Sequence, residues 1–327
     1  MNREAFKDLY FRNNLMSEFD DAWKLLEEFG RLFEDLDDID EESLDLGIQY
    51  LVKNDKNTIE NFIVLMRYFK VVKRNELYIH LTRYTGMLDV VDNIVKRIKN
   101  TVNDETYKDI IKGYKMPRLG MSPKELPKRI DDLMKRLDEH LTDDLVKYVL
   151  TGNNHDVSEK SQLREKIEYE AAVDFKTYLQ ERHERKVKEL TECLNEGKVW
   201  FEQTITEEVI EHVKSNQEVL SAVLENEKLY ITKIPYDTVS YLAATDEVTR
   251  KYMGCHCPFA REAIKEGKKL DERFCYCSAG FAKFPFEVIL GQDLRIRTLE
   301  TILGGSDKCR FEIDLKGVDY KREKVAE

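Results

Sequence analysis

Proline is absent from most of this sequence, and that absence constrains the fold more than any other feature. The chain contains six prolines, and none of them lies in residues 1–116 or 128–234. A proline inside an α-helix removes a hydrogen bond and clashes with the preceding turn, so long proline-free stretches favour helices. Three of the prolines fall within residues 117–127 together with Gly120, a composition typical of a linker. The sequence therefore predicts two helical regions joined by an irregular connection.

The C-terminal third of the chain has a different pattern. Residues 228–320 mix short alternating segments with glycines, which is typical of short strands. A length of 327 residues corresponds to about two domains. We therefore expect an α+β fold that is predominantly α. It would comprise a helical domain (1–115), a linker (116–127) and an α/β domain (128–327) with a small antiparallel sheet in its cysteine-rich C-terminal module.

The charge and the hydropathy argue against two classes of partner. Lys and Arg number 53 against 64 Asp and Glu, a formal net charge of −11, whereas nucleic-acid binding requires clustered cations. No run of 18 apolar residues is present, and the charged first residues lack the apolar core of a signal peptide. We expect a cytoplasmic protein that binds neither nucleic acid nor membrane. Residues 160–195 read as one long charged helix, which either mediates a homodimer or is a plain amphipathic helix.

Five of the six cysteines lie in the C-terminal module. Two Cys-x-Cys pairs, Cys255 with Cys257 and Cys275 with Cys277, are separated by 17 residues, and Cys309 follows. In an extended chain, side chains two residues apart point the same way, so each pair can direct both sulfurs to one site. Cytoplasmic cysteines are usually reduced, and their clustering indicates metal or redox chemistry before a disulfide framework.

Each cysteine pair also precedes a predicted helix. Pro258 suits the first position of one helix, and the apolar stretch after Cys277 predicts a second helix that ends at Gly291, with Pro285 inside it. A thiol at a helix N-terminus has its anion stabilised by the backbone N–H groups and the helix dipole. Thiolates are the form that metal binding and nucleophilic chemistry both require.

Two alternating segments downstream predict a β-hairpin. Residues 294–302 and 309–315 alternate and are joined by GGSDK, and residues 228–234 predict a further strand. Counting by two places Glu300 on the apolar face of the first segment, and the same count directs Glu312 outward from the second. A buried, unpaired carboxylate is costly, so Glu300 would need a metal, a cation or a hydrogen-bond donor, unless a bulge turns it outward.

Three interpretations of the cysteines remain open. The first is a metal site, most simply a tetrahedral zinc with sulfur ligands and His256 or Glu300; an iron–sulfur cluster fits the ligand count but not the usual spacings. The second is a reactive thiol with His256 as the nearby base. The third is a set of inert cysteines in a small core. The remaining histidines are predicted to be surface or packing residues: His80, His140, His155, His183 and His212.

The C-terminal segment resembles the 4-vinyl-reductase-type small-molecule-binding domain and, more weakly, the L-2-amino-thiazoline-4-carboxylate hydrolase family. The resemblance rests on Cys277, Gly280, Glu300, Gly305, Cys309 and Phe311. It implies a small antiparallel sheet with helices around an apolar ligand pocket, and a zinc held by Cys277, Glu300 and Cys309. Leu303 stands where the family has a further cysteine. The CHCP element is similar to an uncharacterised bacterial family with the same two cysteine pairs.

We therefore expect a small-molecule-binding protein with a cysteine-held zinc beside its ligand pocket. The metal ligands would come from Cys255, Cys257, Cys275, Cys277, Glu300 and Cys309. The pocket would be lined by His256, Phe281 and Phe284. The alternative is a hydrolase that acts on a small C–N or C–S compound through a cysteine thiolate or a metal-bound water. A helical interaction protein with structural cysteines is the third possibility.

Overall fold

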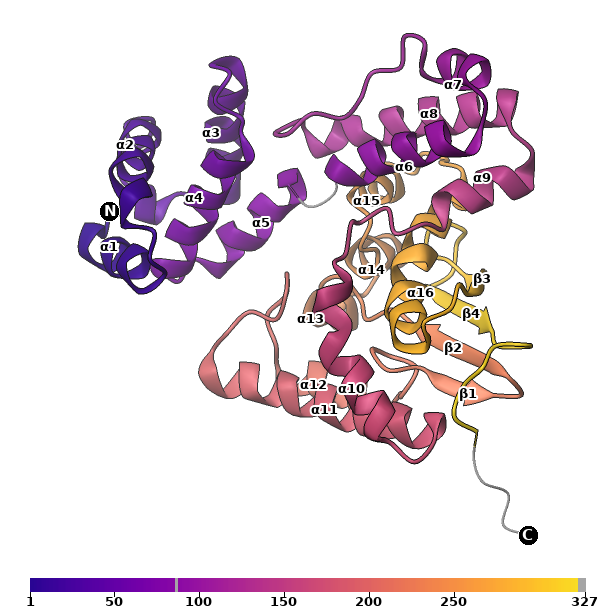
Figure 1. The fold of residues 1–327 in the computed structure, drawn as a ribbon. Helices are drawn as coiled ribbons and strands as arrows, with labels where there is room; N and C mark the ends of the chain where they lie inside the picture. Colours follow the sequence, from indigo (N-terminus) through magenta and orange to yellow (C-terminus); the bar gives the residue numbers. More distant parts are fainter. Residues whose placement is uncertain (86–87, 323–327) are drawn as a thin grey trace. The chain divides into compact units, whose positions relative to one another are not determined.

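The computed structural model describes residues 1–85 and 88–322, and the chain forms two compact units (Figure 1). Unit 1 comprises residues 1–88 and 117–125, and unit 2 comprises residues 89–116 and 126–327. The fold is α+β and predominantly α, as the sequence predicts. Among the helices of the described residues, none combines the length and the apolar character that a membrane span requires.

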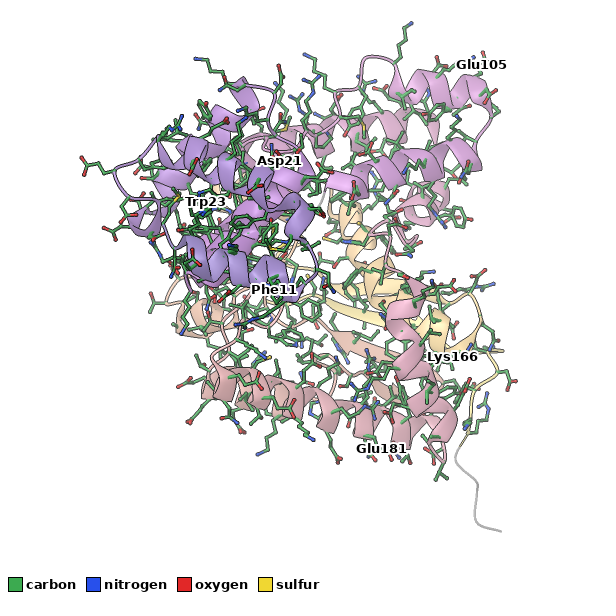
Figure 2. All side chains as sticks on the ribbon, turned by 60° about the vertical axis from the view of Figure 1, so that its left-hand side comes forward. Phe11, Asp21, Trp23, Glu105, Lys166 and Glu181 are labelled. Carbon is green, nitrogen blue, oxygen red and sulfur yellow. The ribbon has the colours of Figure 1, made fainter. Side chains whose placement is uncertain are left out.

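Unit 1 is an all-helical bundle around an aromatic core. Its α-helices are α1 (Arg3–Arg12), α2 (Phe19–Gly30), α3 (Glu41–Lys53), α4 (Ile59–Val71) and α5 (Asn75–Thr85). Phe6 and Tyr10 on α1 are fully buried, and their rings lie 4.7 Å apart, whereas Phe11 on the same helix is exposed (Figure 2). The helices begin at polar caps. Thr58, for example, accepts a hydrogen bond from the backbone N–H of Asn61 at the start of α4.

Two helices that the expected boundaries place in the N-terminal domain belong to unit 2. These are α6 (Leu88–Thr101) and α7 (Asp104–Ile111). The guanidinium of Arg136 donates to the carbonyls of Ile110 and Lys112, at 3.1 and 2.8 Å, and so joins the end of α7 to α8 (Leu126–His140). The linker prolines therefore lie within the fold. Residues 117–125 pack with unit 1, where Asn57 donates to the carbonyl of Leu119 at 2.8 Å.

The other helices of unit 2 surround its small sheet. They are α9 (Asp143–Leu150), α10 (Leu163–Ala171), α11 (Phe175–Glu196), α12 (Glu207–Lys214), α13 (Thr238–Ala243), α14 (Glu247–Gly254), α15 (Pro258–Lys265) and α16 (Tyr276–Leu290). The strands are β1 (Val223–Glu225), β2 (Lys228–Thr232), β3 (Arg295–Glu300) and β4 (Arg310–Asp314). The sheet has the order β1-β2-β4-β3, and each neighbouring pair is antiparallel.

The core of unit 2 lies between this sheet and the helices α10, α11 and α16, which cover one of its faces (Figure 1). Phe175 from α11 and Phe286 from α16 pack with Leu229 of β2 and Ile313 of β4. The predicted hairpin is therefore confirmed as β3 and β4, and its apolar face meets the helices. This packing fixes the start of α16 beside the end of β2, where the candidate site lies.

Two local predictions are wrong. The predicted helix over residues 160–195 is interrupted between α10 and α11, because Asp174 caps α11 by accepting a hydrogen bond from the backbone N–H of Thr177 at 2.8 Å. Glu312 was expected to point outward, but it is only 5% exposed. Lys228 and Arg297 on the two neighbouring strands cover it and pair with its carboxylate, at 3.2 and 2.9 Å.

Candidate functional site: a cysteine and histidine cluster in unit 2

The five C-terminal cysteines are brought together by four segments of unit 2. Cys255 follows α14, Cys257 precedes α15, Cys275 and Cys277 lie at the start of α16, and Cys309 directly precedes β4. All are free thiols. Burial raises the pKa of Cys255 and of Cys275, and the neighbouring cysteine side chains raise both further. The sulfurs are therefore close enough to oppose one another's ionisation.

The local sequence explains how the first pair is placed. Pro258 is the first residue of α15, as predicted, so the chain between α14 and α15 stays extended across Cys255 and Cys257. Gly254 allows this turn to approach the β3–β4 connection closely. A Cβ atom at Gly254 would stand 2.8 Å from Cδ1 of Ile302. Cys255, which follows Gly254 and is buried, is thereby held against the β3–β4 connection that leads to Cys309.

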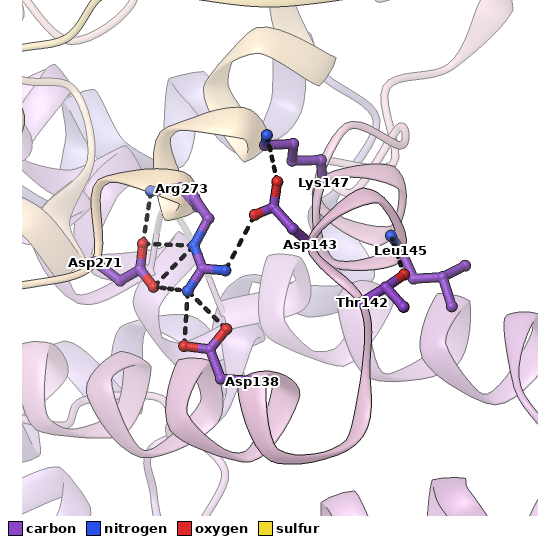
Figure 3. Close-up of polar contacts among 7 residues, drawn as sticks. All are labelled: Asp138, Thr142, Asp143, Leu145, Lys147, Asp271 and Arg273. Carbon is purple, nitrogen blue, oxygen red and sulfur yellow. Dashed lines mark hydrogen bonds and ion pairs between the residues drawn. The ribbon is translucent and has the colours of Figure 1, made fainter.

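The second pair is anchored by an ion network around Arg273 (Figure 3). Arg273 lies in the short 3-10 helix Glu272–Cys275, and its guanidinium reaches Asp138 of α8 at 2.7 Å and Asp143 of α9 at 3.2 Å. It also makes two 3.0 Å contacts with Asp271. Burial alone would raise the pKa of Asp271, but the hydrogen bonds from Arg273 hold it below its usual range. The segment entering α16 is thus fixed to two helices.

Gly280 explains how a histidine from another part of the chain reaches this helix. It lies one turn into α16, and a Cβ atom there would stand 2.5 Å from the carbonyl oxygen of Gly152 and 2.6 Å from that of Thr151. Only glycine allows the backbone after α9 to lie this close to α16. The same loop is held from its other side by Asn154, whose buried amide donates to two carbonyls at the end of α9, at 3.1 and 2.8 Å.

The loop places His155 directly against Cys277. Nε2 of His155 lies 3.5 Å from Sγ of Cys277, within hydrogen-bonding distance for sulfur, and the imidazole packs 4.8 Å from the ring of Phe281. Burial raises the pKa of Cys277 to about 12 and lowers the pKa of His155 to about 4. Both groups are therefore neutral near pH 7, and in the tautomer with its proton on Nδ1 the imidazole accepts a hydrogen bond from the thiol at Nε2.

Lys233 contributes a positive charge to the same cluster. It follows β2, its backbone N–H donates to the carbonyl of Cys309 at 2.9 Å, and its Nζ donates to Oγ of Ser278 at 3.0 Å. The ammonium also lies 5.2 Å from the ring centre of Phe281. Within the described part of the chain, no carboxylate lies within 4.0 Å of it. Its charge favours the thiolate of Cys277 and disfavours protonation of His155.

His256 lies between the two cysteines of the first pair in sequence, and its ring contacts the backbone and an aromatic side chain. Its Nε2 lies 2.6 Å from the carbonyl oxygen of Ile234, and its ring makes an edge contact with Tyr236 at 5.8 Å. Burial, and then the charge of Lys233, lowers the pKa of His256 to about 3. The neutral imidazole must therefore donate from Nε2 to the carbonyl, because a carbonyl can only accept.

The other residues predicted for the site, Glu300, Phe281 and Phe284, have different surroundings from one another. A register shift between Thr298 and Glu300 interrupts β3, and the Glu300 carboxylate lies 3.7 Å from the ammonium of Lys308. Phe281 is 40% exposed beside His155, whereas Phe284 is buried in the core. Among residues 1–85 and 88–322, no three His, Cys, Asp or Glu side chains are arranged to hold a metal ion. The predicted zinc site stays a prediction.

Sequence reasoning missed His155 and Lys233. His155 lies 122 residues before Cys277 and was predicted to be a surface or packing residue. Two features could have marked it: the loop TGNNHD, rich in residues that stabilise turns through their side chains, and a glycine within the helix that follows Cys277. Lys233 could have been noted as a cation within the otherwise apolar end of a strand, directly before Ile234 and Pro235.

Comparisons of the chain with protein-family models, with curated proteins and with solved structures each find no match. The resemblance of the C-terminal segment to the 4-vinyl-reductase-type domain therefore stays a prediction as well.

Proposed function

We propose that unit 2 is a thiol-dependent hydrolase for a small organic molecule, with Cys277 as the nucleophile and His155 as the general base. The contact of 3.5 Å between Sγ of Cys277 and Nε2 of His155 carries the proposal. A nucleophile in hydrogen-bonding contact with a base is the arrangement that covalent catalysis requires. The position of Cys277 in the first turn of α16 and the nearby Lys233 both favour negative charge on the sulfur.

The neutral states of the Cys277 thiol and the His155 imidazole favour activation of the thiol by general-base catalysis. Since the resting thiol and imidazole are both neutral, the proton would leave Sγ only as sulfur attacks the substrate. His155 in its neutral form can accept that proton directly at Nε2. The pair would then work as a hydroxyl–imidazole pair does, without a stable thiolate in the resting protein.

The reaction would proceed in two steps. In the first, Sγ of Cys277 bonds to the electrophilic carbon of a C–N or C–S group, Nε2 of His155 takes the thiol proton, and the leaving nitrogen or sulfur receives it as its bond to carbon breaks. In the second, for a substrate whose attacked carbon is a carbonyl carbon, water attacks the resulting thioester and His155 accepts a proton from the water. The bond between Sγ of Cys277 and the acyl carbon then breaks, and His155 returns the proton to Sγ. Because Cys277 is only 2% exposed, the substrate would have to be small.

Acyl transfer from p-nitrophenyl acetate tests the proposal on the full chain. We expect an acetyl thioester on Cys277, located by peptide mass spectrometry, and no adduct there from a bulky ester. Cys277→Ala should abolish the adduct, and His155→Gln should slow its formation on the order of 100-fold or more. Cys193→Ala is the matched control, because Cys193 lies on α11 outside the cluster. Acylation that spares Cys277, or that is indifferent to His155→Gln, would overturn the proposal.

Zinc binding by the same cysteines is the competing prediction from the sequence, although within the described residues no three His, Cys, Asp or Glu side chains are arranged as ligands. Metal analysis of the untagged chain separates the two. About one zinc per chain, with thiols that titrate only after chelation, would support a cysteine-bound metal. Freely titrating thiols without metal would support the hydrolase proposal.

A further inference from the structure

A second candidate site lies in a polar groove of unit 2 that the cysteine cluster does not use. Its volume is about 780 Å³, within the range of small-molecule sites. The wall on one side comes from the start of α14 and the wall on the other from the end of β3 and the β3–β4 connection. The lining residues are Thr245, Glu247, Arg250, Glu300, Gly305, Ser306, Asp307 and Lys308.

The charged residues of the groove fall into two groups. Glu247 is paired with Lys251, and Glu300 lies 3.7 Å from Lys308, so these carboxylates are neutralised within the protein. Arg250 and Asp307 differ from them. Nη2 of Arg250 donates only to the carbonyl of Ala244 at 3.1 Å. Over the residues described, neither Arg250 nor Asp307 has an oppositely charged side chain within 4.0 Å, although both line the same groove.

The wall that carries Asp307 is held in place by hydrogen bonds. The backbone N–H of Ser306 donates to the carbonyl of Thr301 at 3.0 Å, and the backbone N–H of Gly304 donates to the hydroxyl of Thr301 at 3.0 Å. The hydroxyl of Tyr241 on α13 donates to the carbonyl of Asp307 at 3.3 Å. The backbone that carries Asp307 thus has a defined position on one side of the groove.

From this arrangement we infer that the groove binds a small zwitterion of the amino-acid type. Its carboxylate would pair with the guanidinium of Arg250, and its ammonium with the carboxylate of Asp307. A simple anion would face the unpaired Asp307, and a simple cation would face the unpaired Arg250, so each would be opposed by one of the two charges. Arg suits the carboxylate end, because its planar fork of donors matches carboxylate geometry.

The inference is tested by isothermal titration with three zwitterions of increasing charge separation: glycine, 4-aminobutyrate and 6-aminohexanoate. Singly charged analogues, butyrate and butylamine, serve as reference ligands. We expect at least one zwitterion to bind about tenfold or more tightly than either analogue. Arg250→Met and Asp307→Asn should each remove that advantage. Asp293→Asn and Arg295→Met should not, because these two exposed residues lie outside the groove and have no ion-pair partner among the described residues.

Three results would overturn the inference: no measurable binding of any zwitterion, equal binding of the zwitterions and their singly charged analogues, or binding that persists in both groove variants. None of these three results depends on Cys277, so the groove is tested independently of the proposed hydrolase. The titrations can be repeated on Cys277→Ala, in which we expect the zwitterion to bind unchanged.

Discussion

His80 of unit 1 is buried and His155 of unit 2 is partly buried, and the two histidines have different surroundings. In unit 1, His80 is 4% exposed and lies between two carboxylates, with Nε2 2.6 Å from Asp45 and Nδ1 2.9 Å from Glu41. In unit 2, His155 faces a thiol, an aromatic ring and the positive field of Lys233. One imidazole lies between two carboxylates, and the other is kept neutral by burial and by the charge of Lys233.

This difference separates a structural polar group from a candidate functional one. The carboxylates around His80 join α3 to α5, and they satisfy both ring nitrogens. A buried polar group whose hydrogen bonds are complete contributes to stability and specificity of packing. His155 instead lies against a thiol, and its neutral imidazole can accept a proton during a reaction.

The largest expected effect is a difference in acid stability between the units. The pKa values of His155 and His256, about 4 and about 3, lie below the usual 6.5. Between pH 6.5 and 4 the unfolded chain therefore binds protons that folded unit 2 does not, and its stability falls as the pH falls. The two groups together should cost roughly 2–4 kcal/mol at about pH 5.

Hydrogen exchange followed by mass spectrometry, corrected for intrinsic rates, can resolve this loss by segment. Peptides of α16 and β2 should lose protection before peptides of α3 and α5. The double variant His155→Gln/His256→Gln is the control and should remove the early loss. A simultaneous loss in both units, unchanged in that variant, would contradict the assignment of the two neutral histidines.

The next effect tests how the loop that carries His155 meets α16. Gly280→Ala would usually stabilise a helix, but here the new methyl group meets two backbone carbonyls at 2.5 and 2.6 Å. We expect a loss of about 1–3 kcal/mol in thermal or urea unfolding and a loss of Cys277 acylation. Gly30→Ala is the matched control, because its methyl group meets the flexible end of Met1 at 3.3 Å and lies in ordinary contact with Cβ of Leu36 at 3.8 Å, with no backbone atom among these neighbours. Equal behaviour of the two variants would show that close approach at Gly280 does not position His155.

A smaller effect is expected from the compensated histidine of unit 1. Asp45→Ala removes the acceptor for His80 and Tyr84 and should destabilise unit 1 by about 1–2 kcal/mol, with Asp8→Ala as an exposed control. Burial alone would raise the pKa of Asp45, but the hydrogen bonds from His80 and Tyr84 lower it. The stabilisation is therefore present above pH 3.8 and lost as the pH falls through the lower folded value. Urea titrations of both variants at pH 7 and pH 3 check the size and direction.

The fold class and the ends of several helices could be predicted from the sequence. Proline spacing, the Pro258 helix start and the Gly291 helix end all correspond to elements of the structure. What could not be predicted were contacts between distant segments. The placement of His155 depends on Gly280 accepting the backbone of residues 151 and 152, and no local pattern shows such an approach. The burial of Glu312 likewise depends on Lys228 and Arg297 from neighbouring strands.

The rate of Cys277 acylation as a function of pH tests the central claim most directly. With His155 as the general base, the rate should be nearly constant from about pH 5 to about pH 9 and should fall near pH 4, where the imidazole gains a proton. In His155→Gln the rate should be lower and should rise about tenfold per pH unit, as expected for a thiol whose pKa is raised to about 12. Identical profiles for the two proteins, each rising to a plateau near pH 8.5, would contradict the account.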